Sequence, residues 1–112
     1  MDPERLRLER IADVEGTGRL ANEQIARAAP ESWGRDGDVA LRCECGNDVC
    51  HEPLRVPRDV YERVRGDAML FLLRPGHEVP EAEDVIERDD RFWIVRKHDD
   101  VRHVVEESDP RS

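Results

Sequence analysis

The chain has 112 residues, the length of one ordinary domain. Charged residues make up 40% of it and hydrophobic residues 38%, so it can build only a small core. The net charge of -9 disfavours a broad nucleic-acid-binding surface or an anionic-membrane surface, because both need clustered basic groups.

The sequence gives no indication of a signal peptide or of a membrane span. The start of the chain, "MDPERLRLERIADVEG", lacks the apolar stretch of a signal peptide, and no segment approaches the roughly 20 apolar residues of a membrane span. We therefore expect a cytoplasmic protein without a membrane partner. In that compartment, clustered cysteines favour a metal site or redox chemistry over disulfides.

Residues 1–30 are predicted to form an N-terminal amphipathic helical segment. Apolar residues recur there at spacings of three and four, and the second stripe includes Leu20 and Ile25. The two glycines of "EGTG" cost about 1 kcal/mol each inside a helix, so we expect two helical pieces with a bend between them. Leu20 and Ile25 are candidate contacts for a protein partner.

Residues 31–38 are predicted to be a turn-rich linker. Trp33 is its one large apolar side chain. Packing of Trp33 over the edge of the core is the favoured interpretation, and contact with a partner is the alternative.

Residues 39–98 are predicted to form an α+β core. "VALRC" and "PLRV" have the pattern of strands that enter and leave the cysteine loop, and residues 57–67 have the pattern of a short helix. The apolar run of residues 68–73 predicts a buried strand, and "DVIER" and "RFWIVRK" predict a hairpin. Residues 99–112 are expected to be an acidic tail that starts as a short helix and then frays. The fold class is thus helical segments followed by a small antiparallel sheet with one short helix.

All the cysteines of the chain, Cys43, Cys45 and Cys50, lie in the segment "CECGNDVC". Thiolates bind Zn²⁺ well, and a structural zinc site needs four ligands in a tetrahedron. The "GND" between Cys45 and Cys50 consists of turn-forming residues, which let the backbone fold around a small ion. The C-x-C-x4-C loop therefore predicts a zinc site with three sulfur ligands, although its spacing is not that of the common C-x-x-C knuckle.

Four histidines compete for the fourth position. His51 directly follows Cys50, and adjacent residues of an extended chain point apart. His98 and His103 lie in a charged segment, where solvated side chains are expected. His77 stands in "PGHE" at the end of the most apolar strand, where a sharp turn could aim its ring back across the sheet. We favour His77; the alternative is a metal-free thiol cluster with His77 as a turn residue.

Four segments together carry a resemblance: "RCECGNDVC", "VPRDVYERVR", "FLLRPGHEVPEAEDVIER" and "FWIVRK". In this order they resemble a group of small, mostly uncharacterised bacterial zinc-binding-like proteins, in which a C-x-C-x4-C loop is followed by a P-G-H-E motif. The upstream "ANEQIAR" is similar to the helix that precedes the core in that group. The resemblance covers residues 21–97 and implies that Cys43, Cys45, Cys50 and His77 act together. It implies no defined activity, and the "EGTG" break departs from the pattern.

Motifs of catalytic zinc are missing from the sequence. Neither "HE" begins H-E-x-x-H, and the deaminase pattern of H-x-E with P-C-x-x-C is absent. We therefore expect a non-enzymatic, zinc-binding module that interacts with another protein in a regulatory or accessory role. The alternative is a thiol redox or zinc-release switch, and a nucleic-acid binder or a zinc hydrolase is less favoured.

Overall fold

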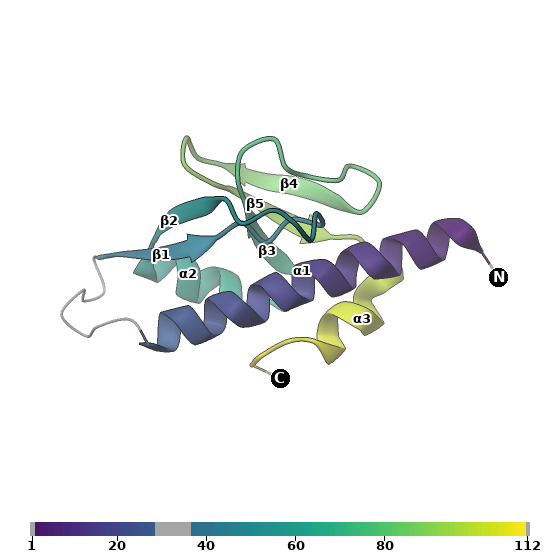
Figure 1. Ribbon diagram of the computed structural model, residues 1–112, viewed down its shortest axis with the longest axis horizontal. Helices are drawn as coiled ribbons and strands as arrows, with labels where there is room; N and C mark the ends of the chain where they lie inside the picture. The colour runs from purple at the N-terminus through teal and green to yellow at the C-terminus, as the bar shows by residue number, and fades with distance from the viewer. Residues whose placement is uncertain (1, 29–36, 112) are drawn as a thin grey trace.

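The computed structural model describes residues 2–28 and 37–111. The fold is α+β, with a long N-terminal helix, two small antiparallel sheets and a short C-terminal helix (Figure 1). In chain order the elements are α1 (Pro3–Ala28), β1 (Asp38–Arg42), β2 (Pro53–Pro57), α2 (Arg58–Arg65), β3 (Leu70–Leu73), β4 (Glu83–Arg88), β5 (Trp93–Lys97), a 3-10 turn η2 (Asp99–Val101) and α3 (Arg102–Glu107). In the described part of the chain, no helix is both long and apolar enough to cross a membrane.

The strands form the hairpins that the sequence predicts. β1 pairs with β2, and the second sheet has the order β3-β5-β4 with all neighbours antiparallel. Every residue of β3 is buried, as its continuous apolar run predicts. In β5, Ile94 and Val95 are both buried, whereas Val85 of β4 is only half-buried beside an irregularity in the pairing. The sheet predicted as one unit is therefore two separate sheets.

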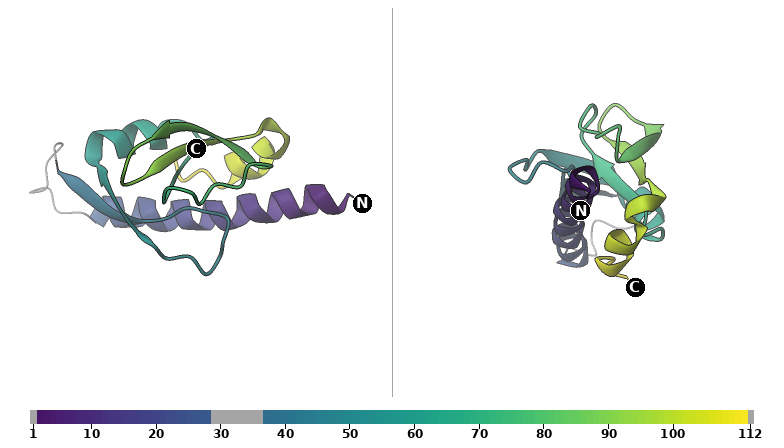
Figure 2. Two further views of the ribbon diagram at one scale, coloured as in Figure 1. Left: turned by 90° about the horizontal axis from the view of Figure 1, so that it is seen from above. Right: turned by 90° about the vertical axis from the view of Figure 1, so that its right-hand side faces the viewer.

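The predicted bend in the N-terminal segment is wrong, because α1 is one continuous helix of 26 residues. It runs along the length of the molecule (Figure 2). Gly16 and Gly18 lie on its buried face. A Cβ at Gly16 would stand 2.7 Å from the Ser108 hydroxyl, and one at Gly18 would stand 3.4 Å from the Glu44 backbone. The glycines thus allow close packing of α1 against other segments, which offsets their cost in helix propensity.

The C-terminal segment contains the predicted short helix, α3, but it is packed against the fold rather than frayed as expected for residues 99–112. Val101 and Val105 are fully buried, and α3 packs against α1. Beyond α3, Arg111 donates to both carboxylate oxygens of Glu23 at 2.6 and 3.0 Å and to Glu62 at 2.8 Å. These contacts hold the end of the described chain against α1 and α2.

The core consists of two groups of buried side chains. One lies between α1, α3 and the β3-β5-β4 sheet; it includes Leu8, Ala12, Met69, Phe71, Leu73, Val95, Val101, Val105 and the three cysteines. The other lies beneath β1, β2 and α2; it includes Val39, Leu41, Leu54, Val56, Tyr61, Val64, Leu72, Phe92 and Ile94. The three cysteines are therefore part of the hydrophobic core.

Candidate metal centre

The loop between β1 and β2 folds into a compact turn. The Asn47 side-chain oxygen accepts from the Val49 backbone N–H at 3.1 Å, and the Asn47 carbonyl accepts from the Cys50 N–H at 3.0 Å. Where the loop closes, the Cys43 N–H donates to the Glu52 carbonyl at 2.8 Å. These bonds curl the loop so that its sulfurs face one point.

His77 reaches the same point from the other sheet. It lies in a turn after β3, where its N–H donates to the Arg74 carbonyl at 3.1 Å. Gly76 has a φ of +86°, a left-handed conformation that residues with a Cβ rarely adopt. This turn brings the ring back toward the cysteine loop, as the sequence predicts.

The four side chains are close enough to share one metal ion. The ligand atoms of Cys43, Cys45, Cys50 and His77 all lie within 4.8 Å of one another. His77 Nδ1 is 3.6 Å from Cys43 Sγ and 3.7 Å from Cys50 Sγ. Tetrahedral zinc with ordinary bond lengths requires sulfur-to-nitrogen separations of about 3.6 Å. The cluster is therefore a Cys3His group that could hold one metal ion.

The sulfurs are shielded from solvent. Cys43 is 1% exposed, Cys45 6% and Cys50 9%. The Arg74 backbone N–H also donates to Cys43 Sγ at 3.2 Å, a bond that orients and stabilises a thiolate ligand.

Hydrogen bonding within the cluster separates the acidities of two of the thiols. The hydrogen bond between Cys43 and Cys45 raises the pKa of Cys43, and burial raises it further. The same bond lowers the pKa of Cys45 to about 5, opposed by burial and assisted by the Asn47 backbone. The thiolate is the form that binds metal, so the lowered pKa of Cys45 favours the ligating form of this side chain.

A buried ionic network lies directly behind the loop and was missed in the sequence. Glu44, between the first two cysteines, is fully buried and receives two hydrogen bonds from Arg65 of α2 at 2.9 and 3.0 Å. It also accepts from Asn22 Nδ2 at 2.7 Å and from the Leu72 N–H at 3.0 Å. The carboxylate thus ties the loop to α1, α2 and β3. The alternation of cysteines with Glu44 in "CEC" was the available signal, because it turns the carboxylate away from the sulfurs.

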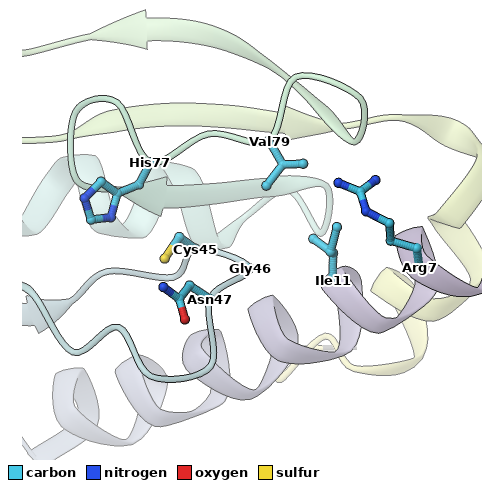
Figure 3. Close-up of a pocket in the computed structure, with 7 residues that line it drawn as sticks. All are labelled: Arg7, Ile11, Cys45, Gly46, Asn47, His77 and Val79. Carbon is cyan, nitrogen blue, oxygen red and sulfur yellow. The ribbon is translucent and has the colours of Figure 1, made fainter. Parts of the chain in front are cut away.

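A cavity of about 330 Å³ opens beside the cluster. Figure 3 shows Cys45 and His77 toward one end of it and Arg7 at the other, with Ile11 and Val79 between them. Cys45 is therefore the sulfur that can be approached through this cavity.

The remaining histidines occupy other places. His51 is exposed, His98 Nε2 lies 3.2 Å from Asp84, and His103 Nε2 lies 3.7 Å from Glu9. His77 is thus the histidine that joins the three cysteines among the described residues.

The candidate partner contacts remain predictions. Leu20 and Ile25 lie on α1 with 48% and 40% of their surfaces exposed. Trp33 and most of the predicted 31–38 linker lie outside the described residues, although Asp38 begins β1.

Comparison of the chain with models of protein families, with curated proteins and with solved structures finds no match.

Proposed function

We propose that the Cys3His group holds zinc and that the zinc is structural. Three soft sulfur donors with one imidazole nitrogen are a donor set typical of structural zinc. The main support is the convergence of all four ligand atoms within 4.8 Å from two segments 27 residues apart, Cys50 and His77. Four protein ligands fill the tetrahedron and leave no position for a substrate or a water nucleophile, so the proposed zinc is not catalytic. A protein without enzymatic activity is part of the same proposal.

In this proposal the ion joins the two halves of a small core. The cysteines belong to the β1-β2 hairpin and His77 follows β3 of the other sheet, so a shared ion links two sheets that have no common strand. Metal binding then contributes directly to the free energy of folding, because the four ligands converge only in the folded chain.

Metal analysis and thermal unfolding test this proposal. Purified wild-type protein should carry one zinc per chain, and chelation should lower its melting temperature. Cys45→Ser and His77→Ala should lose metal, whereas His51→Ala, which removes an exposed histidine next to Cys50, should retain it. Retention of zinc by His77→Ala would contradict the proposed ligand set.

For the folded domain we propose a cytoplasmic interaction or regulatory role. Residues 78–109 contain twelve acidic and five basic residues, a net charge of 5 - 12 = -7, which would steer the protein toward a basic partner surface. The exposed apolar side chains of Leu20 and Ile25 offer contacts on the long helix.

A binding assay can test this surface. Partners captured by wild-type protein should be lost when Leu20 and Ile25 become glutamate, and should persist when Val49 becomes glutamate. Val49 is 76% exposed and lies on the cysteine loop, so it controls for the added charge. If the variant that carries Leu20→Glu and Ile25→Glu captures as much partner as the wild-type protein, the helix is excluded as the binding surface.

A second candidate function is a zinc-release switch, favoured by the position of Cys45 on the wall of the cavity. Peroxide would oxidise the Cys45 thiolate to a sulfenate with release of water, which removes a ligand. A chromogenic chelator should then detect zinc released from the folded protein. Release only after denaturation would leave the purely structural role.

A further inference from the structure

A second cavity, of about 450 Å³, has a lining rich in arginine although the protein is strongly acidic. It is lined by Ala40, Pro53, Arg55, Arg74, Asp90 and Arg91. These residues come from the β1-β2 sheet, the segment after β3 and the turn between β4 and β5. Three arginines therefore meet at one hollow of a chain whose net charge is -9.

The strand register creates the floor of this cavity. Ala40 of β1 lies directly opposite Arg55 of β2, and both are exposed on the outer face of the sheet. The small side chain of Ala40 leaves space beside the long side chain of Arg55. Pro53, two residues before Arg55, lies on the same face and adds a second apolar surface.

Among the described residues, two of the three guanidinium groups have no carboxylate partner. Within the described ranges, the Arg55 side chain has no hydrogen bond or ion pair. Arg74 Nη1 donates to the Pro53 carbonyl at 3.4 Å, which is a neutral acceptor. Arg91 is balanced by Asp38 and Asp89, each at 3.4 Å. Arg55 and Arg74 thus leave positive charge at the cavity that no acid of the described chain neutralises by an ion pair.

We propose that this cavity binds a small phosphorylated organic molecule. Arginine presents a planar fork of donors that suits phosphate, and a phosphate has enough oxygens to accept from more than one fork. The volume falls within the range of small-molecule sites, and Ala40 and Pro53 provide apolar contact for the carbon part of a ligand. Asp90, which also lines the cavity, can accept a hydrogen bond from a ligand hydroxyl or amine.

The charge of the surroundings limits the size of the ligand. A long polyanion such as nucleic acid would extend beyond the cavity along a protein whose net charge is -9, and this overall charge opposes binding. A compact ligand stays beside Arg55 and Arg74, within a screening length of about 8 Å at physiological salt. The site therefore favours a small phosphate ester over a polymer.

Calorimetric titration of the intact, metal-loaded protein tests the site with phenyl phosphate as the probe. Binding should occur in wild-type protein and weaken by about tenfold or more in Arg55→Met and in Arg74→Met, because each loses a charged donor. Arg10→Met is the matched control, since Arg10 is an exposed arginine of α1 away from the cavity. Its affinity should equal that of wild type.

Several results would overturn the proposal: no binding of phenyl phosphate, equal affinity in Arg55→Met and Arg10→Met, or succinate binding as tightly as phenyl phosphate. The last result would assign the cavity to carboxylates. Zinc content is measured on the same samples, so that loss of the phosphate site can be told apart from loss of the metal. Both substitutions should leave the zinc content unchanged, because the Arg74 backbone N–H still donates to Cys43 Sγ.

Discussion

Replacing Glu44 by alanine should destabilise the fold more than any other single change in the loop outside the ligands. The carboxylate accepts four hydrogen bonds, from Arg65 twice, from Asn22 and from the Leu72 N–H. Its removal leaves the Arg65 side chain, 1% exposed, as an unpaired buried charge. The substitution also removes the link between the cysteine loop and α2.

The expected loss is about 3–5 kcal/mol, the cost of breaking a buried ion pair from one side. A domain of this size typically has about 5–15 kcal/mol in total, so the loss is a large share of its stability. Because about 1 kcal/mol shifts the melting temperature of a domain near 100 residues by roughly 4 °C, we expect a decrease of about 12–20 °C.

Urea unfolding followed by circular dichroism at a fixed free zinc concentration measures this loss, because bound metal adds its own stability. Arg63→Met is the control on the same helix: Arg63 pairs with Glu87 in solvent, where an ion pair contributes at most about 1 kcal/mol. A Glu44→Ala loss no larger than that of the control would refute the buried network as a source of stability.

Further predictions concern a second buried network and the histidine turn. Lys97→Met should cost about 3 kcal/mol in urea unfolding, because Lys97 lies fully buried 2.5 Å from Glu15 and 3.0 Å from Glu83; a loss under 1 kcal/mol would contradict this. Burial raises the pKa of Glu15 well above its usual value, so its contribution to stability is full below the unfolded-state pKa and declines as pH rises through the folded-state pKa. Glu15→Gln should therefore flatten the fall in unfolding free energy toward high pH, and an unchanged slope would count against the shift. Gly76→Ala should cost about 1 kcal/mol at its left-handed φ and weaken metal retention through His77, measured by chelator competition; unaltered retention would show that the turn does not position the ring.

The elements that could be predicted from sequence are those set by local pattern. The alternation of "VALRC", the apolar run that contains β3 and the hairpin of β4 and β5 each carry their own signal. The Cys3His group could be predicted because few residue types bind zinc and the chain places its cysteines together.

The features that could not be predicted are contacts between residues that lie far apart in the sequence. Gly16 and Gly18 resemble a helix break until Ser108 and Glu44 are found packed against them. Single-sequence patterns also assign charged residues to solvent, whereas Lys97 is fully buried among carboxylates. Such pairs become visible only when the fold brings the two signs of charge together.

X-ray absorption at the zinc edge of the native protein is the most direct test of the metal centre. We expect one zinc per chain, with three sulfur ligands at about 2.3 Å and one nitrogen ligand at about 2.0 Å. Protein without stoichiometric zinc, or a first shell dominated by oxygen and nitrogen, would contradict a centre built from Cys43, Cys45, Cys50 and His77.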